Sequence, residues 1–165
     1  MYIDIISDYP LRGVMIENMA RIVLRRSKNN NFIFGCRYFD SIDEIISKYK
    51  LDCSEVLRIV NFIRSAGLKT DLIEFDVYDK ISRKVKSINF YDVKSKIRGA
   101  VREYFDICVT SFEFLENISR LGGGAFIITV LIDFKWQVNM EIFPLLDAKI
   151  RIYDSQTNRT KFLIN

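Results

Sequence analysis

The sequence predicts an α+β protein, and three patterns lead to this prediction. Apolar residues recur at helical spacing between Arg12 and Leu68, and they alternate with polar residues from Asp71 to Asp79. Short apolar runs separated by turn residues follow three consecutive glycines at 122–124. With 165 residues, 49% of them hydrophobic, the chain can bury a sizeable core. We therefore expect an N-terminal domain (1–91), a connecting helix (92–121) and a small antiparallel sheet (122–165).

The three helices expected first are indicated by apolar spacing and capping residues. One covers Arg12–Ser27, and a second opens at Ser41, whose side chain can cap the free amides of the first turn. A third follows Asp52, which can form a capping box with Glu55, and ends at Gly67. Since only a short turn separates the second and third helices, they form a helix-turn-helix.

Strands are expected beside and after this helix pair. Phe32–Phe34 reads as a short strand closed by a glycine. The alternating segment Asp71–Asp79 is a half-buried strand, and Val85–Phe90 can return beside it after a polar turn. A helix-turn-helix followed by such a hairpin is a winged helix.

The remainder of the chain predicts one long helix and a meander. From Asp92 to Ser119 apolar residues follow a repeat close to 3.5, with Asp92 as the N-terminal cap. Gly99 and the β-branched pair Val109-Thr110 also allow two shorter helices. This helix is either a homodimer seam or a face that packs on the C-terminal sheet. The segment after Gly124 is expected to form an antiparallel β-meander of short strands.

The absence of histidine and the pattern of cysteines limit the function. Without an imidazole the chain can form neither a Ser-His-Asp or Cys-His nucleophile nor a His-ligated zinc site. The cysteines Cys36, Cys53 and Cys108 form no C-x-x-C pair, so we expect reduced core residues. No apolar run is long enough to span a membrane, and the N-terminus is acidic where a signal peptide is basic. We expect a cytoplasmic protein, in the host cytoplasm if it is viral.

The segment Ser54–Leu68, SEVLRIVNFIRSAGL, resembles the recognition helix of winged helix-turn-helix DNA-binding proteins. The resemblance covers about residues 12–90. The amino-acid usage is typical of A+T-rich coding sequence. In this usage and in the winged-helix pattern, the chain is similar to small regulators of archaea and archaeal viruses. The resemblance implies a transcriptional regulator that binds double-stranded DNA as a homodimer, without catalytic residues, metal or cofactor.

The resemblance places the DNA-binding residues on three segments. In the recognition helix, Arg58 would read guanine and Asn61 adenine, while the wing and the first helix would contact phosphates. The structural alternative for Arg58 is a solvated side chain paired with Glu55 or Glu44. The expected DNA-binding residues are Ser54, Arg58, Asn61, Ser65, Lys80, Arg83, Lys84, Lys86, Arg25 and Arg26.

The distribution of charge supports DNA binding only in part. The formal net charge of +4 conceals basic segments at 12–38 and 80–102, which together could form one phosphate-binding surface. The segment 39–79, which contains the helix-turn-helix, is acidic. This acidic segment favours an alternative function, a winged-helix module that binds protein without binding DNA.

One enzyme hypothesis remains from the C-terminal carboxylates. Asp133 and the segment Asp147-Ala148-Lys149 loosely resemble the D…(D/E)-x-K metal site of restriction-type nucleases, with Glu113 or Glu116 as a third carboxylate. Carboxylate oxygens hold Mg²⁺, and the lysine would polarise water or phosphate. Such folds normally continue with a helix and further strands after the motif, whereas this chain ends soon after Lys149.

Overall fold

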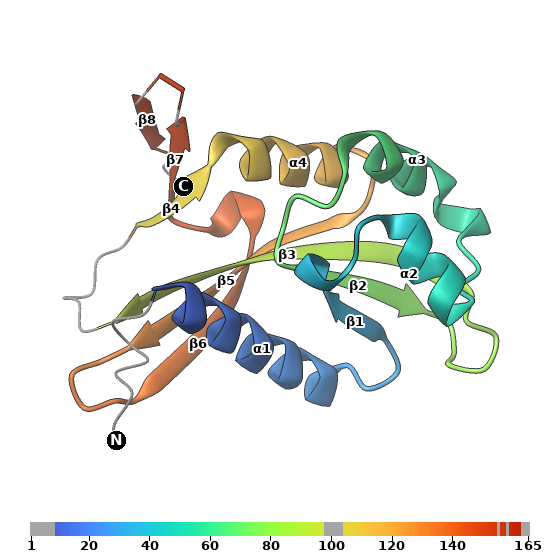
Figure 1. Cartoon of the computed structure of the whole chain (residues 1–165), viewed down its shortest axis with the longest axis horizontal. Coiled ribbons are helices and arrows are strands. Elements are labelled where there is room, and N and C mark those ends of the chain that lie inside the picture. Colours follow the sequence, from blue (N-terminus) through green and yellow to red (C-terminus); the bar gives the residue numbers. More distant parts are fainter. Residues whose placement is uncertain (1–8, 98–103, 155, 158, 163–165) are drawn as a thin grey trace.

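The computed structural model describes residues 9–97, 104–154, 156–157 and 159–162, and it is a mixed α+β structure (Figure 1). The expected α+β class is thus confirmed. Four helices and eight strands are present in the described residues: α1 (Tyr9–Ser27), β1 (Phe32–Gly35), α2 (Ile42–Tyr49), α3 (Leu57–Ala66), β2 (Leu72–Val77), β3 (Val85–Ile97), β4 (Phe105–Cys108), α4 (Val109–Arg120), β5 (Gly124–Ile132), β6 (Val138–Pro144), β7 (Ile150–Asp154) and β8 (Arg159–Phe162).

The main sheet has five strands in the order β1-β2-β3-β5-β6. All neighbours in it are antiparallel except β3 and β5, which run parallel, so the chain must cross over between them. The segment that crosses over contains β4 and α4. A second sheet of three strands, in the order β4-β7-β8, lies beside α4.

Helices cover both faces of the main sheet. On one face, α1 buries Ala20 and Leu24 against Tyr91 of β3 and Ile128 of β5. On the other face, the buried side chains of α2, α3 and α4 join those of β2 and β3 in a larger core that includes Phe90. Figure 1 shows α1 on one side of the sheet and α3 and α4 on the other. The sheet is therefore a shared middle layer.

The expected helix pair and hairpin are present, but their context differs from a winged helix. Ser41 caps α2 by accepting a hydrogen bond from the Glu44 amide, as predicted. The predicted capping box is wrong, because Glu55 pairs with Tyr78 and Lys84 and the chain makes a 3-10 turn before α3 begins. The hairpin β2–β3 has β1 on one edge and β5 on the other, so only its turn projects as a wing would.

The expected long helix from Asp92 to Ser119 is wrong. Asp92 lies within β3, where it pairs with Ile127 of β5, and β3 continues to Ile97. Residues 98–103, with Gly99, lie outside the described residues, and a helix appears only at Val109. Tyr91 and Val93 alternate with Asp92, and this two-residue alternation is typical of a strand. The spacing of close to 3.5 residues over the longer segment favours a helix instead.

The C-terminal segment is only partly the expected meander. β5 and β6 form an antiparallel pair, but β5 also extends the main sheet in parallel with β3, and β7 pairs in parallel with β4. Strand β3 runs across the expected boundary at residue 91. Cys36 and Cys53 are buried as expected, whereas Cys108 is exposed, so its assignment to the core was wrong. Within the described ranges, none of the helices has the length and apolarity that crossing a bilayer requires.

Candidate functional site

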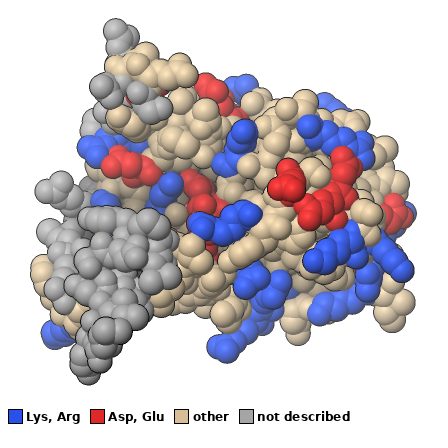
Figure 2. All heavy atoms as spheres, in the orientation of Figure 1, with Lys and Arg blue, Asp and Glu red and all other residues tan. Residues whose placement is uncertain are grey.

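A cluster of carboxyl groups lies where α1 meets the strands β2 and β3. It contains Glu17 of α1, Asp71 immediately before β2, and Asp92 of β3, with Lys94 beside them. Because Leu72 pairs with Tyr91, Asp71 stands opposite Asp92, and the two-residue period of a strand puts Lys94 on the same face as Asp92. Figure 2 shows acidic and basic side chains close together on the surface that faces the viewer.

Asp71 is held against β3 by the backbone. The Val93 amide donates a hydrogen bond to Asp71 Oδ2 at 2.7 Å. Burial and the nearby carboxylate of Asp92 raise the pKa of Asp71, the Val93 amide and Lys94 oppose the shift, and the net result is a pKa of about 7.

Asp92 is the most deeply buried acid of the cluster, with 3% of its surface exposed. Lys94 Nζ lies 3.1 Å from Asp92 Oδ2, but outside hydrogen-bond geometry, so this oxygen has no hydrogen-bond partner in the described part of the chain. Burial lowers the pKa of Lys94, but the charges of Asp92 and Asp71 outweigh it and the pKa is raised. A buried oxygen without a partner is costly unless a ligand satisfies it.

Glu17 is oriented by an arginine that follows β1. Arg37 donates two parallel hydrogen bonds to the Glu17 carboxylate, at 2.6 and 2.7 Å. Burial raises the pKa of Glu17, the contact with Arg37 lowers it, and the charge of Asp71 raises it, with a net upward shift. Glu17 therefore extends the cluster from α1 and brings an exposed guanidinium to its rim.

Glu74 shows how a structural buried acid differs from this cluster. It is fully buried on the α1 side of the sheet, and its two oxygens accept hydrogen bonds from four side chains at 2.6 to 3.2 Å: Lys28, Asn31, Asn89 and Tyr91. Every charge-bearing atom of Glu74 is thus satisfied by the protein itself. Asp92 has no such set of donors.

The chemistry of the cluster fits a hard divalent cation. Carboxylate oxygens are the preferred ligands of Mg²⁺, and the buried Asp92 Oδ2 accepts no hydrogen bond in the described residues, although Lys94 Nζ lies 3.1 Å from it. No three His, Cys, Asp or Glu groups of the described residues already stand at metal-ligating spacing.

The residues expected to read DNA lie on the surface of α3 and the turn before it. Arg58 is exposed on α3, and Ser54 is exposed in the 3-10 turn. Asn61 accepts a hydrogen bond from Arg64 at 2.9 Å, and the Ser65 hydroxyl donates to the Phe62 carbonyl at 2.9 Å. Three of these residues thus belong to α3, and Ser54 belongs to the turn that precedes it.

The expected wing residues are mostly engaged in ion pairs. Lys84 pairs with Glu55 at 3.2 Å and Lys86 with Asp76 at 3.7 Å. Arg83 turns back to donate to the Tyr49 carbonyl at 2.5 Å. These contacts direct three of the four wing cations onto the protein.

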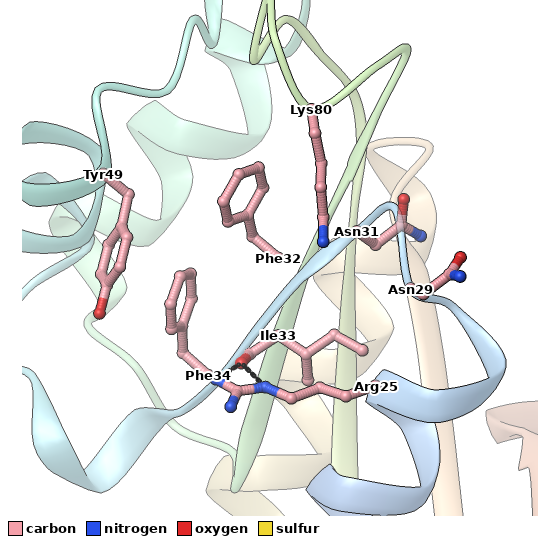
Figure 3. A pocket seen from close by; sticks show the side chains of 8 residues that line it. All are labelled: Arg25, Asn29, Asn31, Phe32, Ile33, Phe34, Tyr49 and Lys80. Carbon is pink, nitrogen blue, oxygen red and sulfur yellow. Dashed lines mark hydrogen bonds between the residues drawn. The ribbon is translucent and has the colours of Figure 1, made fainter.

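Of the expected DNA-binding residues, Lys80 and Arg25 are brought together although one belongs to the wing and the other to α1. Both line one cavity, shown in Figure 3. Arg26, which follows Arg25 on α1, is exposed outside that lining. None of the expected α3 residues belongs to the lining of this cavity.

The carboxylates of the enzyme hypothesis are not brought together. Asp133 caps the β5–β6 turn by accepting the amides of Lys135 and Gln137, at 2.8 and 3.0 Å. Asp147 is exposed in the turn after β6, so the length of that strand separates the two acids. On α4, Glu113 is exposed and Glu116 pairs with Arg120 at 3.0 Å. The placement of the D…(D/E)-x-K pattern at these residues is wrong.

No protein-family model, curated protein or solved structure matches the chain. Glu17, Asp71, Asp92 and Lys94 are absent from the residues that the sequence predicts as functional. The signal in the sequence is an acid at the start of one strand followed by an acid-x-lysine on the next, and the prediction of Asp92 as a helix cap obscures it.

Proposed function

We propose that the protein is a Mg²⁺-dependent nuclease that hydrolyses phosphodiester bonds of nucleic acid at the cluster of Glu17, Asp71, Asp92 and Lys94. The observation that carries the proposal is the register of β2 and β3, which sets Asp71 opposite the buried Asp92, whose Oδ2 accepts no hydrogen bond in the described residues and lies beside Lys94. Asp71 and Asp92 would hold the metal, with Glu17 as a further carboxylate from α1.

The order of residues supports a site similar to that of restriction-type nucleases. The pattern D…(D/E)-x-K is met by Asp71 and by Asp92-Val93-Lys94 on adjacent strands. After Lys94 the chain continues with β4, α4, β5 and β6, that is, with a helix and further strands, as such folds normally do.

Each side chain of the cluster has a distinct part in the proposed reaction. A bound Mg²⁺ supplies positive charge where negative charge develops during phosphoryl transfer. Asp71, whose raised pKa keeps it partly protonated near neutral pH, would give up its proton when the cation binds, and Arg37 keeps Glu17 oriented by two hydrogen bonds. Lys94 places an ammonium beside Asp92, where it can donate a hydrogen bond to a phosphate oxygen or to the attacking water.

Cleavage of plasmid and of short DNA and RNA substrates with Mg²⁺ tests the proposal. We expect cleavage that is lost in EDTA and falls at least about 100-fold in Asp92→Asn, because a ligand and a buried charge are removed together. Asp147→Asn is the matched control, since it makes the same change in an exposed turn, and it should retain wild-type activity. An Asp92→Asn variant as active as Asp147→Asn would refute the proposed site.

A second candidate function is a DNA-binding transcriptional regulator, as the winged-helix resemblance implies. The exposed Arg58 and Asn61 on α3 favour it. In that case Arg58→Ala should relax base preference by about 1 to 3 kcal/mol in mobility-shift measurements, whereas Lys84→Ala should weaken all sequences alike. Binding that survives in EDTA without any cleavage, and that depends on Arg58, would favour this function, as a homodimer in the cytoplasm. DNA-independent capture of a protein through α2 and α3 would favour the protein-binding module.

A further inference from the structure

A line of charged residues leads from the carboxylate cluster along α1. Glu17, Arg21 and Arg25 are spaced four residues apart, so they follow one another on one side of the helix. At one end Glu17 contacts Arg37, and at the other Arg25 donates two hydrogen bonds to the Ile33 carbonyl, at 2.8 and 3.1 Å. Arg21, between them, has a buried Nε that is without a hydrogen-bond partner among the described residues. This side of α1 is thus a basic track that starts at the proposed active site.

The track ends in a cavity of about 370 Å³ between α1, β1, α2 and the β2–β3 turn (Figure 3). Figure 3 shows the Lys80 ammonium reaching into it from the turn, with the Phe32 and Tyr49 rings on its wall and Arg25 along its base. Both rings are only partly buried. None of the described residues that line the cavity carries a carboxylate, so its charge is positive.

The lining of this cavity matches the two parts of a nucleotide. Aromatic rings stack on nucleobases, and arginine and lysine bind phosphate. The volume lies in the range of pockets that hold small ligands. A base in a duplex is stacked and paired on both sides, so only an unpaired nucleotide can place its base against Phe32 or Tyr49.

The distance between cavity and cluster fits a single continuous strand. Glu17 and Arg25 lie eight residues apart on α1, which corresponds to roughly 12 Å along the helix axis. At roughly 3.4 Å per stacked nucleotide, this separation spans about three or four nucleotides. The backbone of a strand that joins the two places would run past Arg21.

We propose that the cavity lined by Arg25, Phe32, Tyr49 and Lys80 binds an unpaired nucleotide of the substrate strand, about three or four nucleotides from the bond that is cut. The inference rests on the proposed nuclease function and refines it: the preferred substrate carries a single-stranded segment. The same chemistry would also suit a free mononucleotide, which the test below separates.

Binding measured without metal tests the cavity independently of cleavage. The probe is a fluorescent oligothymidylate of about 12 nucleotides in EDTA, followed by anisotropy. We expect Lys80→Glu to weaken binding about 10-fold or more, because it places a carboxylate in the phosphate site. Lys135→Glu makes the same change in the exposed β5–β6 turn, at the opposite end of the molecule in Figure 1, and should weaken binding about 3-fold at most.

A second variant separates stacking from charge. Phe32→Leu keeps every charge of the cavity, and its melting temperature shows whether the fold is intact. We expect about 10-fold weaker binding of the oligothymidylate from loss of the ring. Thymidine monophosphate should bind far more weakly than the oligonucleotide; equal affinity, dependent on Lys80, would mean a site for a free mononucleotide and would overturn the proposal.

Cleavage of a duplex with a single-stranded overhang, compared with a blunt duplex, completes the test. We expect a lower KM for the overhang substrate, a preference that Lys80→Glu abolishes by raising KM while kcat stays near the wild-type value. If the protein cleaves nucleic acid but Lys80→Glu and Lys135→Glu change the KM for the overhang substrate equally, the cavity proposal is overturned. The proposed nuclease function is then unaffected. Lys80-dependent binding of the oligonucleotide without any cleavage would support the cavity and refute the nuclease.

Discussion

Asp71 and Asp92 stand opposite each other across the β2–β3 pair, because the neighbouring residues Leu72 and Tyr91 are paired. Asp92 is almost fully buried, and the Val93 amide donates a hydrogen bond to Asp71. Burial and the nearby carboxylate of Asp92 raise the pKa of Asp71 to about 7. In the proposed site, a cation would take the place of the proton on Asp71.

The first prediction concerns the pH dependence of metal binding. Because the pKa of Asp71 is about 7, Mg²⁺ must displace its proton below that pH. We expect the increase in melting temperature caused by Mg²⁺ to be larger at about pH 8 than at about pH 5.5, and Asp71→Asn to lose it at both. A Mg²⁺ effect that is the same at both pH values would contradict this prediction.

The second prediction concerns the stability of the metal-free protein. The pKa of Asp71 is raised from 3.8 to about 7 on folding, so between these values the native state binds more protons than the unfolded state. The contribution of Asp71 to stability is therefore greatest below the unfolded pKa of 3.8, and it is lost as pH rises through the folded pKa of about 7. Chemical denaturation from about pH 4 to about pH 8 should show this loss in the wild type and a smaller loss in Asp71→Asn.

The third prediction concerns Arg37 as a positioning residue for Glu17. Its two hydrogen bonds hold the carboxylate and oppose the effect of burial, so without them the pKa of Glu17 rises further. Arg37→Gln should shift the lower limb of the pH–rate profile upward, with a greater loss of rate at about pH 6 than at about pH 8.5. Arg120→Gln, which breaks an exposed pair on α4, is the control and should leave the profile unchanged. An unshifted profile in Arg37→Gln would exclude this role.

The parts of the fold that the sequence predicted are those with local signals. The Ser41 cap, the apolar spacing of α2 and α3, and Gly67 in a left-handed conformation after α3 all act within a few residues of one another. The β2–β3 hairpin is local in the same sense, since a short polar turn joins alternating segments.

The parts of the fold that the sequence did not predict depend on pairing between segments that are distant in the chain. Asp92–Ile97 is a strand because β5 pairs with it in parallel, and that partner lies beyond α4. The candidate site depends on the same extension of β3, because Glu17, Asp71 and Asp92 meet only where β3 continues past Phe90 beside β2 and α1 packs against the sheet. A pattern search along the chain could find acid-x-lysine, but it could not tell Asp92-Val93-Lys94 from Asp147-Ala148-Lys149 without knowing which one is on a central strand.

The fourth prediction separates the structural acid Glu74 from the acids of the proposed site. Glu74→Ala removes the acceptor of Asn31, Asn89 and Tyr91, so it should lower the free energy of unfolding by about 3 kcal/mol. Burial raises the pKa of Glu74, but these hydrogen bonds and Lys28 outweigh it and lower the pKa. The contribution of Glu74 is thus present above the unfolded pKa of 4.5 and is lost as pH falls through the folded value. Glu113→Ala, at an exposed position on α4, should cost less than about 0.5 kcal/mol.

The last prediction uses Cys108 as a reporter of the site. This exposed thiol precedes α4; burial raises its pKa, but hydrogen bonds with Ser111 and Thr110 and the charge of Lys94 lower it overall. Burial raises the pKa of both Cys36 and Cys53, so iodoacetamide should alkylate Cys108 first. Lys94→Met should slow that alkylation, because it removes a positive charge that favours the thiolate. Lys86→Met removes a charge from the same strand where it pairs with Asp76, and it should leave the rate unchanged. Mass spectrometry of the alkylated peptides measures the rate at Cys108. Equal alkylation rates in Lys94→Met and Lys86→Met would show that the charge of Lys94 does not act on the Cys108 thiol.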